Sequence, residues 1–117
     1  MSAYKQNLVI EQGATFSFNI LWTESDGSTP VDLTNYTAEM DIRATYDDPA
    51  TIIQLDTTNG RITLGGTAGT IQLNISATDT AALSFDSAVY DLELTAPDGT
   101  VTRLMEGGVS FSPEVTR

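Results

Sequence analysis

AVYDLELTAPDGTVTRLMEGGVSF, from Ala88 to Phe111, is the stretch whose pattern points to a fold. Its first arm alternates apolar residues with acidic or hydroxyl residues, and a β-strand turns successive side chains to opposite faces. Pro97-Asp98-Gly99 has the chemistry of a tight turn, because proline presets φ, aspartate bonds nearby backbone and glycine accepts positive φ. The second arm is therefore expected to pair back antiparallel as a β-hairpin. Gly107-Gly108 interrupts the alternation and predicts a bulge or bend there.

The same alternation recurs outside the hairpin. In residues 15–23 four large apolar side chains, from Phe16 to Trp22, fall on one face, which predicts a core strand. In residues 37–43 the inner face would carry Ala38, Met40 and Ile42. Besides the hairpin, strands are expected at residues 4–10, 15–23, 37–43, 51–55, 61–64 and 70–75.

Two glycine-containing segments connect these strands. Asn59-Gly60 is the strongest two-residue signal for a type I′ turn, so residues 61–64 are expected to fold back on residues 52–55. Gly65–Gly69 holds three glycines and predicts a flexible loop. A phosphate-binding loop is not indicated there, because no lysine follows and no helix begins.

One short segment has a helical pattern. A helix of one or two turns is expected near residues 78–83, capped by Thr78 or Asp79. The remaining pattern gives about seven to nine short strands with turn signals roughly every 8–12 residues, which is typical of an antiparallel β-sandwich or small barrel. The sequence thus predicts an all-β protein.

Length and composition limit the possibilities further. The 117 residues are expected to form a single domain, 1–117, with extended terminal arms at about 1–10 and 110–117 that offer strands to a neighbour. The net charge of −11 argues against nucleic acid and anionic membrane as partners. The acidity either serves solubility or matches a basic partner surface. No apolar run approaches the roughly 20 residues needed to cross a bilayer.

A search for reactive side chains yields no catalytic, cofactor-binding or metal-binding residues. The chain has neither cysteine nor histidine, which excludes thiolate chemistry and removes the commonest general base and metal ligand. Asp47-Asp48 is the densest carboxylate pair, and it is interpreted as a solvated loop tip rather than a Ca²⁺ site. Tyr46 is kept as a possible contact residue, whereas Trp22 is assigned to the core. The prediction is a protein that is not an enzyme and uses no cofactor.

Several segments resemble small proteins of tailed-bacteriophage virions, in particular the immunoglobulin-like N-terminal module of baseplate and tail proteins. The segments that carry the resemblance are YDLELTAPDGTVTR (residues 90–103), EGGV (106–109), SPEVTR (112–117), VDLTNYTA (31–38), IR (42–43), GRITL (60–64) and IQLNISA (71–77). They share turn and strand residues rather than a catalytic motif. The chain ends at Arg117 without a fibre or receptor-binding head, which argues against direct recognition of the host.

The resemblance implies an immunoglobulin-like antiparallel sandwich and a non-enzymatic structural role in the virion. The protein would be a head decoration or cement protein, or a tail, baseplate or adaptor component, assembled in the host bacterial cytoplasm. Its partners would be major capsid, tail or adaptor subunits, with a homo-oligomer in the particle and no nucleic acid or membrane contact. The alternative is a stand-alone carbohydrate- or ligand-binding β-sandwich module. The residues predicted to contact partners are Tyr4, Lys5, Tyr46, Asp47, Asp48, Pro113, Glu114 and Val115.

Overall fold

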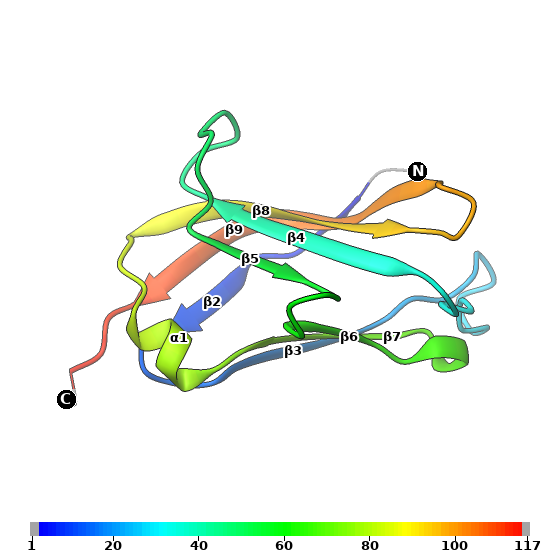
Figure 1. The fold of residues 1–117 in the computed structure, drawn as a ribbon, viewed down its shortest axis with the longest axis horizontal. Coiled ribbons are helices and arrows are strands. Elements are labelled where there is room, and N and C mark those ends of the chain that lie inside the picture. Colours follow the sequence, from blue (N-terminus) through cyan, green and yellow to red (C-terminus); the bar gives the residue numbers. More distant parts are fainter. Residues whose placement is uncertain (1–2, 116–117) are drawn as a thin grey trace.

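Two β-sheets pack face to face in the structure, a computed structural model that describes residues 3–115 (Figure 1). The larger sheet has the order β1-β9-β8-β4-β5, and β2 also pairs with β9. Its strands are β1 (Tyr4–Lys5), β2 (Leu8–Glu11), β4 (Thr37–Arg43), β5 (Ile53–Asp56), β8 (Ser87–Thr95) and β9 (Val101–Ser112). The smaller sheet has the order β3-β7-β6, with bounds Phe16–Leu21, Thr70–Ile75 and Ile62–Leu64. The prediction of an all-β sandwich is confirmed.

The order of strands within the two sheets can be compared with the layers of an immunoglobulin-type sandwich. In that fold, strands G, F and C, with C′ in variable-type domains, face strands B, E and D. Here β9, β8, β4 and β5 occupy the first set of positions, and β3, β7 and β6 occupy the second. The loop between β4 and β5 projects away from both sheets, whereas the β8–β9 turn and helix α1 (Ala77–Ala81) lie at opposite ends of the molecule (Figure 1).

The N-terminal segment predicted as a strand and extended arm forms β1 and β2 of the larger sheet, whereas only residues 110–112 of the predicted C-terminal arm belong to a strand, β9. Both β1 and β2 pair in parallel with β9, so the sheet is mixed rather than wholly antiparallel. The physical reason is burial: Leu8 and Ile10 enter the core while Val9 faces out, and the strand that carries them needs a backbone partner. The outermost parts of the predicted arms, residues 1–2 and 116–117, lie outside the described residues.

The hairpin forms as predicted, but its bulge lies elsewhere. Leu92 pairs with Met105 and Glu93 with Arg103, so Leu104 is the extra residue. Gly107 and its neighbour Gly108 stay in register with β8. Glycine is required at 107 because a Cβ there would collide with the Gln6 carbonyl oxygen of the segment between β1 and β2.

The predicted hairpin around Asn59-Gly60 does not form. β5 and β6 lie in different sheets, so this turn carries the chain from one layer to the other. A type I′ turn needs positive φ at both central residues, but Asn35 is the only non-glycine residue with positive φ in the described part of the chain. Asn59 instead accepts the Asp56 and Arg61 backbone N–H groups through its side-chain oxygen, at 3.1 and 3.0 Å.

Two shorter predictions are also corrected. The segment expected to be a flexible loop contains a 3₁₀ turn, η1 (Gly66–Ala68), which ends at Gly69 with φ of 71°. The short helix predicted near residues 78–83 is confirmed as α1, but its cap is Ser76 and not Thr78 or Asp79: the Ser76 side chain accepts the Asp79 N–H at 3.1 Å. An ion pair of 2.9 Å from Arg61 to Asp79 ties the helix to the β5–β6 turn and lowers the pKa of Asp79.

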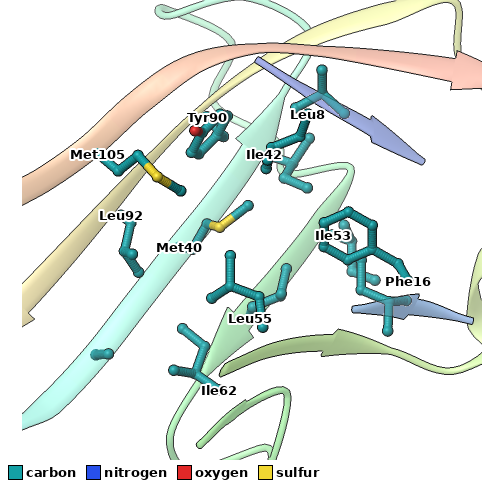
Figure 2. Packing of buried hydrophobic residues seen from close by; sticks show 14 of the residues in the cluster. Leu8, Phe16, Met40, Ile42, Ile53, Leu55, Ile62, Tyr90, Leu92 and Met105 are labelled. Carbon is teal, nitrogen blue, oxygen red and sulfur yellow. The ribbon is translucent and has the colours of Figure 1, made fainter. Parts of the chain in front are cut away.

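The core fills the space between the sheets. Side chains from both layers interdigitate, as Figure 2 shows for residues that include Phe16, Met40, Leu55 and Leu92. The predicted inward residues of β4, β7 and β8 are buried. Each fully buried Leu or Ile side chain is worth about 1.5–3 kcal/mol relative to exposure. Trp22 is half-buried rather than central, and it packs edge-on against Tyr36 with ring centroids 6.3 Å apart.

Candidate interaction surfaces

The outer face of the larger sheet carries acidic residues in cross-strand register. Glu39 lies opposite Glu93, and Asp41 lies opposite Asp91. Like charges directly opposite each other on a sheet are destabilising. Partial burial raises the pKa of Glu39, and the nearby carboxylates, first among them Asp41, raise it further. The carboxylates on this face therefore repel one another and destabilise the folded state.

Three of the chain's five basic residues lie on the same face and offset part of that repulsion. Arg43 binds Asp41 at 2.9 Å. Arg103 lies 3.5 Å from both Asp91 and Glu106, and Lys5 also binds Glu106. The hydrogen bond from Lys5 is the main reason that the pKa of Glu106 is lowered.

A shallow depression of about 430 Å³ lies among these charges. Its lining includes Lys5, Arg43, Tyr46 and Arg103. Beneath it, the Tyr90 hydroxyl donates to the Gln6 carbonyl oxygen, and burial raises the pKa of this phenol. Across residues 3–115, no three His, Cys, Asp or Glu side chains are grouped so that they could hold a metal ion.

The residues predicted to contact partners fall in three separate places. Tyr4 and Lys5 lie on β1, and the depression brings Lys5 together with Tyr46 from the β4–β5 loop. Tyr46 is 92% exposed at that loop tip. Pro113–Val115 follow β9 and do not border the depression. The structure thus joins two of the predicted contact residues and leaves the others apart.

Several of the predicted residues hold local structure. The Asp47 carboxylate accepts from the Thr45 hydroxyl at 2.9 Å, and the Asp48 carboxylate accepts from the Ala50 N–H at 3.0 Å. The Glu114 backbone N–H donates to the Gln12 side chain at 2.8 Å. These contacts shape the β4–β5 loop and the end of the chain. Val115 is 90% exposed.

The smaller sheet presents a face of a different kind, which the sequence reasoning missed. Its three strands contain no charged residue in a chain of net charge −11. We call its outward side chains the uncharged face: Ser17, Asn19, Leu21, Thr63, Thr70, Gln72 and Asn74. The sequence does carry one signal for this face, because residues 12–23 and 62–78 contain no charged residue. Only the fold shows that these two segments belong to the same sheet.

The flank beside β3 is open. Within residues 3–115, β3 pairs with β7 on one side and with no strand on the other. Two hollows run along this open flank, between β3 and the β1–β2 segment, with volumes of about 770 and 210 Å³. Three exposed apolar side chains border them: Tyr4, Val9 and Leu21, each more than half exposed.

In the described residues no helix is long and apolar enough to span a membrane. The structural features that stand out are surfaces: a charged face with a depression, an uncharged face and an open flank. No family model matches the sequence, and a search of curated proteins gives no significant match.

Proposed function

We propose that the chain is a non-enzymatic structural component of a tailed-phage virion that acts through symmetric protein–protein contacts. It would serve as a head decoration or cement protein, or as a tail, baseplate or adaptor protein. The resemblance of its turn and strand segments to virion proteins motivates the proposal. The observation that carries it is the uncharged face on a strongly acidic chain.

The physical argument concerns how acidic subunits assemble. Copies of net charge −11 repel one another, so a stable contact must avoid opposing carboxylates. The cores of protein interfaces are depleted in charged residues, and the uncharged face meets that condition, whereas the outer face of the larger sheet does not. In a symmetric particle many copies of a modest contact act together through avidity.

Mass spectrometry of purified particles tests the role directly, because a virion component co-purifies at a fixed ratio to the major capsid or tail protein.

A matched pair of variants tests the uncharged face. Thr63→Glu adds a carboxylate to it on β6, and Thr37→Glu adds one to the outer face of the larger sheet at the exposed start of β4. We expect lower occupancy for Thr63→Glu and near-normal occupancy for Thr37→Glu. Equal occupancy of the two variants would count against the proposal.

One observation favours the alternative of a ligand-binding module. The depression on the larger sheet combines an exposed tyrosine, Tyr46, with the cationic side chains Lys5 and Arg103. Aromatic and polar groups together suit a sugar or an anionic small molecule. Binding on a glycan array that is lost in Tyr46→Ala would support this alternative over the structural role.

A further inference from the structure

We infer that two copies of this chain pair through the open edges of their β3 strands. The pairing is antiparallel and two-fold symmetric, and it joins the two smaller sheets into one continuous sheet. The inference names one contact of the proposed assembly, and its biological role rests on the proposed function. The geometry itself is testable on the purified chain alone.

The backbone of β3 has free hydrogen-bonding groups in a regular array. The Trp22 N–H donates to the Gly69 carbonyl at 2.9 Å, which places the polar groups of Trp22 on the β7 side. Backbone groups alternate in direction along an antiparallel strand, so Phe16, Phe18 and Ile20 also bond toward β7. The N–H and C=O groups of Ser17, Asn19 and Leu21 then point away from β7 to the open flank.

This array is self-complementary. In an antiparallel pair centred on Asn19, Asn19 lies opposite its own copy and Ser17 lies opposite Leu21 of the other copy. All three of these residues have outward-pointing backbone groups, so each pair exchanges two hydrogen bonds. On the inner side, Phe18 would lie opposite Ile20, an aromatic–aliphatic pair of the kind that stabilises sheets. Both side chains are only partly buried in the single chain.

The edge lacks the usual protection against strand addition. Sheet edges are normally blunted by lysine, proline, bulges or inward charges. The sequence of β3 is FSFNIL, which has none of these residues, and β3 pairs with β7 without a register shift. An unprotected apolar edge on the flank where Tyr4, Val9 and Leu21 are exposed indicates a surface that is covered in the assembled state.

Charge identifies the occupant as a second copy. Two chains of net charge −11 meet here through strands that carry no charge. Each hollow has one charged residue in its lining: Lys5, whose ammonium group binds Glu106 of its own chain, in the hollow beside Phe18–Thr23, and Glu11 in the hollow beside Thr15–Phe18. These two side chains lie toward opposite ends of β3, so antiparallel pairing brings Lys5 of each copy toward Glu11 of the other. The open flank of one copy is therefore complementary in charge to the open flank of the other.

Cysteine cross-linking tests the register, because the chain has no native cysteine. Asn19→Cys places the two thiols on a symmetric pair whose Cα atoms lie about 5.5 Å apart, within disulfide reach. Gln72→Cys is the matched control on the same face, because Gln72 is the cross-strand neighbour of Asn19 on β7. Its two copies would lie roughly 14 Å apart, three strand spacings. We expect rapid disulfide dimers for Asn19→Cys only; equal or preferential cross-linking of Gln72→Cys would indicate stacking of the uncharged faces and overturn the inference.

Two edge variants test self-association by sedimentation. Asn19→Pro removes an outward N–H that the β7 ladder does not use, and proline is tolerated on edge strands. Asn19→Lys places like charges opposite each other and serves if the proline variant misfolds by circular dichroism. We expect the unmodified chain to show a dimer mass and both variants to show a monomer mass, with Asn19→Thr remaining dimeric. A monomeric unmodified chain, or dimeric Asn19→Lys, would overturn the inference.

The outcomes separate this interface from the virion role. A chain that is present in particles but shows neither β3 cross-linking nor dimer mass keeps the proposed function and overturns the pairing. If the chain forms the β3-linked dimer but is absent from every particle preparation, the pairing stands and the proposed function is overturned.

Discussion

At the scale of single residues, Thr80 shows how one hydroxyl stabilises the end of the sandwich. It is the one fully buried polar side chain that the described residues contain. Its Oγ1 donates to the Ala14 carbonyl at 2.8 Å and accepts the Gly13 N–H at 3.1 Å. Helix α1 is thereby fixed to the turn between β2 and β3.

Replacing Thr80 with valine keeps the shape and removes both hydrogen bonds. The Gly13 N–H and Ala14 carbonyl would then lose their hydroxyl partner, so we expect a loss of about 1–3 kcal/mol in the free energy of unfolding. Urea denaturation measures it. Thr78→Val, on the exposed side of the same helix, is the control and should change stability by less than about 0.5 kcal/mol. Similar losses for the two variants would contradict the assigned role.

At the scale of elements, the segment between β1 and β2 lies close beside β9 at Gly107. A Cβ on Gly107 would collide with the Gln6 carbonyl, whereas a Cβ on Gly108 would find its nearest neighbour at an ordinary 3.5 Å. We therefore expect Gly107→Ala to lower the free energy of unfolding by about 1–3 kcal/mol, the usual cost of overpacking. Gly108→Ala should be nearly neutral. Thermal unfolding of both variants checks this. Equal midpoints would show that the backbone around Gln6 shifts to accept the added methyl group at little cost.

Asp56, Glu39 and Glu93 lie side by side on β5, β4 and β8, and we call them the acidic row. The charge of Glu39 in this row is expected to make the fold less stable at neutral pH than at acidic pH. The pKa of Glu39 is raised in the folded state, so the folded state holds a proton more readily than the unfolded state does. The cost of the Glu39 charge is then fully present at pH 7 and is relieved as the pH falls through the raised pKa. Glu39→Gln should raise the thermal midpoint at pH 7, and the gain should shrink as the pH falls through the raised pKa and be nearly gone below 4.5, the ordinary value.

Glu24→Gln is the charge-matched control for this effect. Glu24 lies in the exposed turn after β3, away from the acidic row, and its replacement should leave the midpoint nearly unchanged. A gain for Glu39→Gln that persists undiminished at acidic pH would assign the effect to something other than charge.

At the scale of the whole molecule, the first strands pair with the last. Tyr4 lies opposite Met105 and Leu8 lies opposite Val109, so the larger sheet is complete only when both ends of the chain are in place. Contacts this distant in sequence carry a large loop-closure cost, so they depend on the rest of the fold to hold the two ends together. The N-terminal strands are therefore part of the cooperative unit.

Two truncations compare the two ends of the chain. Deleting residues 4–11 removes Leu8 and Ile10 from the core and uncovers β9, and we expect the cooperative thermal transition to be lost. Deleting residues 113–117 removes little packing from the described structure and should keep the transition, while weakening incorporation into particles. A cooperative transition in the first truncation, or unchanged incorporation of the second, would contradict these expectations.

Local alternation made most of the strands predictable. Met40 and Ile42 on β4, and Leu92 and Leu94 on β8, were assigned to the inner face from spacing alone, and all four are buried. The predicted contact residues were harder to place, because exposure of Tyr46 or Val115 says nothing about which surfaces share a partner. The uncharged face needed three segments, distant in sequence, to be recognised as neighbours.

The sequence by itself determined the all-β class, the β8–β9 hairpin and the inward residues, because the two-residue period is a property of each strand alone. Only the tertiary structure decided which strands are neighbours. It placed β5 and β6 in separate sheets despite Asn59-Gly60, and it paired the N-terminal strands in parallel with β9. It also left β3 as the open edge. Backbone hydrogen-bonding groups are the same in every strand, so the choice of partner depends on how the whole core packs.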